Sequence, residues 1–260
     1  MPLTFPSHAA AILPLLHLPG TRRLAPSALV VGSTAPDLSY LLGAYGGADS
    51  HRPWGLINFC LPAGLVAFLY LEWLLLPVLG PLLWPLLPKP WQRAGIRLLH
   101  PRPLPGRLTE WLAISLAIVL GAATHQFWDG FTHPGMWPAR ALYPDLGIPL
   151  LGHQVLFSRL LQHLSTVLGT VVVLLYVLYV VVPSSTGEPP REDRAGGTKR
   201  LGHLVLWPLL GGAVAGVLRL HHQNELLTDA VWEAAWSLVA WFVLLLGAAC
   251  LLVRGRRMAR

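Results

Sequence analysis

The chain has 260 residues, of which 54% are hydrophobic and only 12% are charged. Soluble globular domains carry roughly 25% charged residues, so this composition excludes an ordinary soluble protein and indicates a polytopic membrane protein. The formal net charge of +7 would suit nucleic-acid binding, but the basic residues fall between apolar runs, as membrane topology requires. We therefore expect membrane lipids, and no nucleic acid, around this chain.

The first 45 residues precede the first long apolar run. Their two apolar stretches, Phe5 to Leu18 and Pro26 to Gly43, are too short or too polar for comfortable spans, and Arg22 and Arg23 lie between them. This pattern predicts a re-entrant helical hairpin, because irregular backbone is tolerated at membrane depth where protein buries it. Two complete but short spans are the alternative.

Five later runs approach the ~20 residues that a helix needs to cross a bilayer. They are Trp54 to Pro77, Leu108 to Phe131, Arg159 to Val182, Leu204 to Leu220 and Val231 to Val253. The expected fold class is therefore all-α, a polytopic integral membrane helical bundle of about five transmembrane helices plus the N-terminal hairpin. Residues 1–182 would form a membrane-embedded domain, 183–203 a mobile cytoplasmic loop, and 204–260 two C-terminal transmembrane helices with a basic tail.

Lys and Arg gather in the loop before the second span, in the loop after the third span and in the C-terminal tail. Short loops rich in these residues stay on the cytoplasmic side. The distribution predicts a multi-pass protein of the bacterial cytoplasmic (inner) membrane with a cytoplasmic C-terminus. The loops on the outer side then carry Arg52, Arg140, Arg159 and Arg219.

The clearest chemical group is His125, Asp129 and His133, at the outer end of the second span. A spacing of four places His125 and Asp129 on one helix face, where both can ligate one metal ion or bond to each other. Pro134 disfavours helical backbone at His133, which should therefore lie on the turn that caps the span. A hydrogen-bonded cluster without a metal is the alternative.

Three more groups fall on the same side of the membrane: His8, Asp37 and His51. A set of His and Asp side chains suits Zn²⁺, with Mn²⁺ as the alternative, and the carboxylates offset the charge of the ion in a low-dielectric setting. Such an ion makes hydroxide available near neutral pH. Gln162 and His163, early in the third span, could support the site as outer-shell residues.

The order of these motifs resembles a known family. Ser-His-Ala-Ala, Gly-Ser-Thr-Ala-Pro-Asp, Ser-His, and His-x-x-x-Asp with Phe-Thr-His are similar to the bacterial membrane family labelled domain of unknown function 4184. That family is in turn similar to the YdjM-type membrane-bound metal-dependent hydrolases. The resemblance spans about residues 1 to 170, and it implies these metal ligands: His8, Asp37, His51, His125 and Asp129. Where the hydrolases read Pro-Asp-x-Asp, this chain has Ser39, which argues against a second metal or a general base there and leaves Ser39, like His133, as a candidate additional or outer-shell residue.

These inferences predict a membrane-embedded metal-dependent hydrolase whose site lies at the outer membrane face. A phosphoester of a lipid or envelope substrate suits that place, and the four outer arginines could bind phosphate or simply anchor the chain at the interface. The alternative is a non-catalytic membrane protein, either a metal-ion transporter or a scaffold with a structural His/Asp cluster. A transporter should continue its polar groups across the bilayer, and beyond the outer cluster only Glu72 does so.

Overall fold

The computed structural model describes residues 5–18, 25–42, 47–100, 103–150, 153–181, 183, 205–206, 208–214 and 227–258. Its α-helices are α1 (Phe5–Ile12), α2 (Pro26–Thr34), α3 (Gly47–Ser50), α4 (Leu61–Leu69), α5 (Leu76–Leu83), α6 (Lys89–Leu99), α7 (Leu108–Thr132), α8 (Ala139–Leu142), α9 (Phe157–Tyr176) and α11 (Leu227–Met258). The loop expected at 183–203 and most of the span expected at Leu204 to Leu220 lie outside the described residues.

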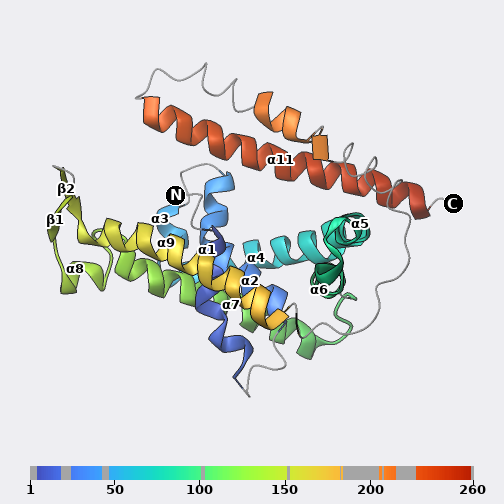
Figure 1. Ribbon diagram of the computed structural model, residues 1–260, viewed down its shortest axis with the longest axis horizontal. Helices are drawn as coiled ribbons and strands as arrows, with labels where there is room; N and C mark the ends of the chain where they lie inside the picture. Colours follow the sequence, from blue (N-terminus) through green and yellow to red (C-terminus); the bar gives the residue numbers. More distant parts are fainter. Residues whose placement is uncertain are drawn as a thin grey trace. The chain divides into compact units, whose positions relative to one another are not determined.

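Shorter helical segments and one small sheet complete the described part. The 3-10 segments are Pro14–Leu16, Ala35–Leu42 and Trp84–Leu86, and the π-helical segments are Leu56–Cys60, Tyr70–Leu75 and Val177–Val181. Strands β1 (Gly147–Leu150) and β2 (His153–Leu156) pair antiparallel, with Gly147 opposite Leu156. The prediction of an all-α membrane bundle is confirmed (Figure 1), and this hairpin is a small addition to it.

Among the described residues, four helices are long and apolar enough to cross a membrane: Leu56–Leu86, Leu108–Thr132, Phe157–Val180 and Ser237–Gly255. They correspond to four of the five spans expected from the sequence. Many of the large side chains on Phe157–Val180 are exposed, Val167 by 63% and Leu168 by 62%, as lipid-facing residues are. The N-terminal apolar helix Ser7–Leu16 is shorter.

The first span continues past Pro77, the end expected from the sequence, to Leu86. Proline lacks an amide hydrogen and collides with the preceding turn. Here a widened π-helical turn precedes Pro62 and another precedes Pro77, and such turns absorb the disruption without ending the helix. Residues 78–86 are therefore helical.

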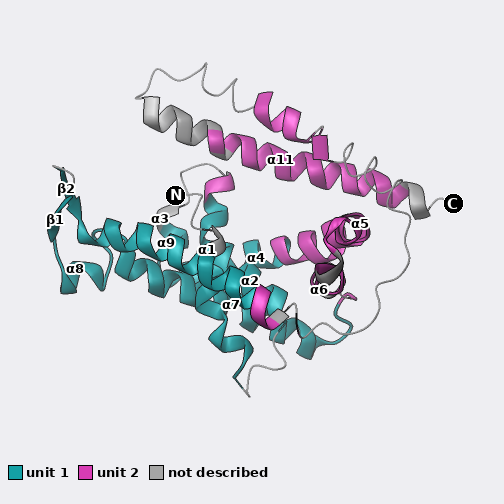
Figure 2. Cartoon of the chain, in the orientation of Figure 1, with its two compact units in different colours: residues 1–39, 45–66, 105–177 teal, residues 40–44, 67–104, 178–260 magenta. Residues whose placement is uncertain are grey.

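The chain divides into two compact units (Figure 2). Unit 1 holds residues 1–39, 45–66 and 105–177, and unit 2 holds residues 40–44, 67–104 and 178–260. Residues 67–104 thus group with the C-terminal helix α11, although they fall within the predicted domain 1–182. A core of Leu74, Val78, Leu82, Leu246 and Cys250 lies in unit 2.

In unit 1, α2 packs along α7 and α1 packs along α9. Glycines let α2 and α7 approach closely, because a Cβ at Gly32 would collide with the backbone of Ile118 and a Cβ at Gly121 with the backbone of Leu29 and Ser33. At the start of α7, the carboxylate of Glu110 accepts a hydrogen bond from the Gly106 amide at 2.8 Å. Unit 1 contains the described residues that form the candidate site.

Candidate metal centre

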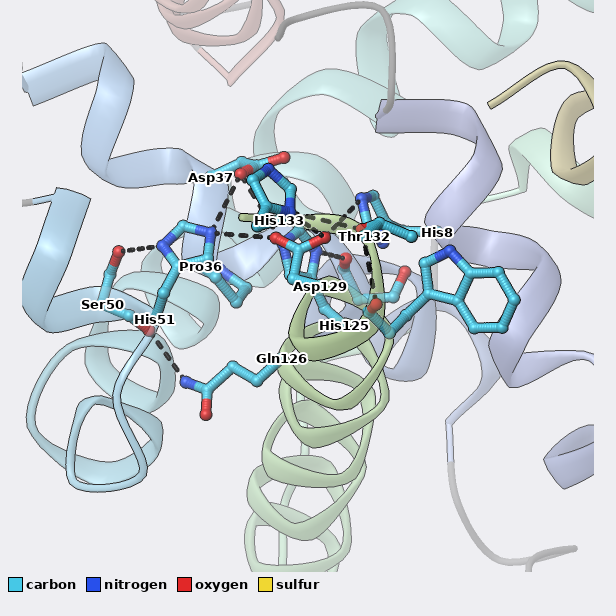
Figure 3. Close-up of polar contacts among 12 residues, drawn as sticks. His8, Pro36, Asp37, Ser50, His51, His125, Gln126, Asp129, Thr132 and His133 are labelled. Carbon is cyan, nitrogen blue, oxygen red and sulfur yellow. Dashed lines mark hydrogen bonds and ion pairs between the residues drawn. The ribbon is translucent and has the colours of Figure 1, made fainter. Parts of the chain in front are cut away.

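Five buried or nearly buried side chains meet near the C-terminal end of α7 (Figure 3). His125 and Asp129 come from α7 itself, one helical turn apart on the same face, as their spacing predicts. The other three come from α1, from the 3-10 segment Ala35–Leu42 and from the turn after α3, and they are His8, Asp37 and His51. These are the five residues that the resemblance implies as ligands.

Asp129 lies at the centre of this cluster, and both of its oxygens face imidazole nitrogens. Its Oδ2 lies 3.1 Å from His125 Nε2 and 3.5 Å from His51 Nε2. Its Oδ1 lies 3.7 Å from His8 Nε2 and 3.4 Å from His133 Nδ1. The side chain is only about 5% exposed, so a single carboxylate is shared among four rings in a dry setting.

Asp37 approaches two of the same rings. Its Oδ1 lies 3.4 Å from His51 Nε2 and 3.6 Å from His125 Nε2. The ligand atoms of His8, Asp37 and His125 lie within 4.8 Å of one another, and so do those of His51, His125 and Asp129. The described part of the chain thus offers two overlapping groups that can hold a metal ion.

The separations fit an ion of the size of zinc. Bonds of about 2.0–2.2 Å in a tetrahedron place neighbouring ligand atoms about 3.3–3.6 Å apart. The four distances that join the Nε2 atoms of His51 and His125 to one oxygen each of Asp37 and Asp129 run from 3.1 to 3.6 Å. These four nitrogen–oxygen separations are therefore close to those between neighbouring ligands of one zinc ion.

The protonation of His125 is fixed by the backbone of α2. Its Nδ1 lies 2.8 Å from the carbonyl oxygen of Ser33, and a carbonyl can only accept, so the hydrogen of the neutral ring is on Nδ1. The Nε2 atom then carries a lone pair. It is buried with no hydrogen-bond partner among the described residues, and it faces the oxygens of Asp37 and Asp129. A metal cation would satisfy this lone pair and both carboxylates at once, whereas in the metal-free alternative a second ring hydrogen on Nε2 would be donated to Asp129 at 3.1 Å.

His133 lies where Pro134 predicts, on the turn that ends α7, with extended backbone angles of φ −108° and ψ 129°. Burial lowers the pKa of His133 below its ordinary value, which keeps the ring neutral. Its Nε2 lies 2.9 Å from Nε2 of the buried Gln162 on α9. Gln162 and His133 therefore form a line of contacts that reaches Asp129 from outside the cluster.

The other two residues expected to support the site differ from each other. His163 is exposed on α9, because the residue after the inward-facing Gln162 points away from the cluster. Ser39 is 1% exposed and donates a hydrogen bond to the Pro36 carbonyl at 2.9 Å. It contacts the cluster through Ser50 and His51, not through a direct contact with a carboxylate.

The arginines expected on the outer side have separate surroundings. Arg52 pairs with Asp49 at 3.7 Å and lies over the ring of Trp54, while Arg159 is exposed on α9. Arg140 lines a small pocket together with Pro134, Tyr143 and Ser158. Pro134 directly follows His133 in the chain. Arg219 lies outside the described residues.

Three residues that hold the cluster in place were not singled out from the sequence: Ser33, Ser50 and Gln126. Gln126 donates hydrogen bonds to the carbonyl oxygens of Ser50, at 2.8 Å, and Arg52, at 3.1 Å. The turn that carries His51 is thereby tied to α7. The polar side chain of Gln126, next to His125, was a signal that the sequence offered. Its partners are backbone carbonyls, which every residue has, so the sequence does not indicate which residues it binds.

The comparisons with known proteins agree with the motif order. Residues 1–253 match the family described as Domain of unknown function (DUF4184). The chain belongs to this family. No curated protein and no solved structure matches it. The family's description gives no activity, so the similarity to YdjM-type hydrolases stays a prediction and function has to be argued from the cluster itself.

Proposed function

We propose that the His/Asp cluster binds a divalent metal ion, zinc in the first place and manganese as the alternative. The observation that carries this proposal is the lone pair of His125 Nε2, which is buried, has no hydrogen-bond partner among the described residues and faces two carboxylates. Burying carboxylates in an apolar bundle without a counter-charge is costly. Imidazole and carboxylate together favour zinc, whereas calcium and magnesium prefer oxygen ligands throughout.

The second part of the proposal is that the chain is a membrane-embedded metal-dependent hydrolase. The partial exposure of the cluster supports this second part. The side chains of His51 and His133 are 12% and 32% exposed, whereas the side chain of His125 is fully buried. A metal site that serves only structure is closed on all sides, whereas a catalytic one keeps one side open. A bound ion would lower the pKa of water in that opening so that hydroxide forms near neutral pH.

The residues of the chain would then have separate tasks. His51, His125, Asp37 and Asp129 hold the ion, with His8 stacked on the ring of His125 at 3.8 Å between centroids. For the substrate, we propose a phosphoester of a lipid or envelope compound. Arg140 is the arginine best placed for its phosphate oxygens, because the pocket that it lines begins at Pro134, next to His133.

The test begins with the protein purified in detergent without chelator, with metals measured by mass spectrometry. We expect zinc or manganese at close to one equivalent or more, and slow hydrolysis of phosphoesters, first bis(p-nitrophenyl) phosphate and then phospholipid vesicles. Activity should disappear with EDTA and return with the metal. Folded protein without metal would refute the whole proposal, and bound metal without hydrolysis of any phosphoester would refute the enzyme and favour a scaffold or transporter.

The location of the site at the outer face of the bacterial inner membrane is also a proposal. It is supported by Arg102 and Arg107 just before α7, because arginines favour the cytoplasmic side for the start of that helix, with Asp129 near its other end. A fluorescent protein fused after Arg260 should be bright, and alkaline phosphatase fused there should be inactive. A phosphatase fusion after Asp145 should be active, and the reverse pattern would overturn the topology.

A further inference from the structure

Two buried hydroxyl groups, those of Ser50 and Ser39, connect the ring of His51 to the backbone carbonyl of Pro36 in a chain of hydrogen bonds. Ser50 Oγ lies 2.9 Å from His51 Nδ1 and 3.1 Å from Ser39 Oγ, and Ser39 Oγ lies 2.9 Å from the oxygen of Pro36. Ser50 and Ser39 are 0% and 1% exposed. Water therefore does not compete for these hydrogen bonds.

The direction of every bond in this chain follows from its end. The Pro36 carbonyl can only accept, so Ser39 gives it its hydroxyl hydrogen. Ser39 then has only lone pairs left, so it accepts from Ser50. Ser50 in turn has given its hydrogen away, so the contact with His51 requires a hydrogen on the imidazole Nδ1.

We propose that Ser39 and Ser50 are positioning residues that hold His51 in the tautomer with hydrogen on Nδ1, so that its Nε2 lone pair is presented to the metal. The other ring atom supports this reading, because Nε2 lies 3.4 Å from Asp37 Oδ1 and 3.5 Å from Asp129 Oδ2. The Ser33 carbonyl does the same for His125. One ring is thus fixed by a carbonyl directly and the other through two hydroxyl groups.

The two serines differ in what their loss should do. In Ser50→Ala the ring loses the acceptor that Ser50 provides, which weakens the preference for hydrogen on Nδ1. In Ser39→Ala the hydroxyl of Ser50 loses Ser39 as an acceptor and can donate to Nδ1 instead, which moves the ring hydrogen to Nε2 and blocks the metal. Groups that orient a metal-binding histidine typically contribute about 10- to 100-fold to affinity, so we expect losses of that size, larger for Ser39→Ala.

The matched control is Thr34→Ala. Thr34 lies on helix α2, and its hydroxyl donates to the Val31 carbonyl at 2.9 Å, so this variant also removes a hydroxyl that bonds to a backbone carbonyl, but outside the hydrogen-bonded chain from Pro36 to His51. Zinc affinity is measured with a competing chelator for the wild type and the three variants, in detergent. Thermal unfolding is recorded in parallel to check that the variants fold. The hydrogen bonds that the Ser50 carbonyl accepts from Gln126 and Cys60 do not depend on the side chain, so Ser50→Ala should keep them.

The second readout does not depend on metal. Imidazole ¹⁵N chemical shifts of the metal-free, histidine-labelled protein report the tautomer, and a His51→Gln sample identifies the signals of His51. The wild type and Thr34→Ala should show hydrogen on Nδ1, Ser39→Ala hydrogen on Nε2, and Ser50→Ala a smaller share of hydrogen on Nδ1 than the wild type. A His51 tautomer that is the same in all four proteins would refute the positioning role.

The affinity measurement rests on the proposed metal site, whereas the tautomer measurement does not. Together they distinguish a failure of the metal site from a failure of the positioning role. If the wild type binds no metal, the proposed function fails, and the tautomer series still decides the role of the serines. If the wild type binds zinc and Ser50→Ala and Ser39→Ala bind it as tightly as Thr34→Ala, the positioning proposal fails while the metal site stands.

Discussion

Replacing Asp129 with asparagine is expected to remove metal binding from a protein that still folds. The carboxylate lies within 3.7 Å of four imidazole rings, so its charge acts on all four at once. Asparagine keeps the shape but loses the charge, and its NH₂ group cannot ligate. Groups that only orient a ligand contribute about 10- to 100-fold to affinity, so loss of the central ligand should exceed 100-fold.

Asp145→Asn is the control for this change. Asp145 is exposed and has a φ of 52°, a left-handed conformation that asparagine adopts readily, so the same chemical change is made away from the cluster. Metal content by mass spectrometry and zinc affinity by chelator competition should match the wild type in Asp145→Asn and collapse in Asp129→Asn. If both variants bound zinc as tightly as the wild type, the ion would be bound outside the cluster.

The sequence was sufficient for the parts of the fold that depend on hydrophobic run length and on helix-ending residues. The span expected at Leu108 to Phe131 is α7, Leu108–Thr132, because charged residues precede it and Pro134 follows it. The first span was ended too early, because the effect of Pro77 on a helix depends on a wide turn before it. Nothing in the composition of residues 147–156 distinguished the small hairpin from a loop.

The candidate site could be assembled from sequence only as far as its side chains. Spacing places His125 beside Asp129, and the membrane side that they share with His8, Asp37 and His51 made a meeting plausible before any geometry was known. The groups that orient the rings could not be predicted from the sequence. The Ser33 carbonyl belongs to the backbone and would be present with any residue at that position. Ser50 and Gln126 likewise act through contacts that depend on how distant segments pack.

Replacing Gly121 with valine should have the largest effect on stability, although Gly121 contacts no candidate ligand. A Cβ at this position would lie 2.7 Å from the Ser33 amide nitrogen and would also collide with the Leu29 carbonyl. Both obstacles are backbone atoms of α2, which cannot move aside as a side chain can. We expect a loss of more than about 3 kcal/mol, at or above the usual range for overpacking.

The same substitution should also weaken zinc binding, because it separates α7 from the helix whose Ser33 carbonyl orients His125. Gly106→Val is the matched control, since a Cβ there meets nothing within 4 Å. Thermal unfolding in detergent and zinc affinity should both fall in Gly121→Val and stay unchanged in Gly106→Val. A Gly121→Val protein that unfolds at the wild-type temperature would mean that α2 does not lie against α7, and that the carbonyl of Ser33 does not hold His125.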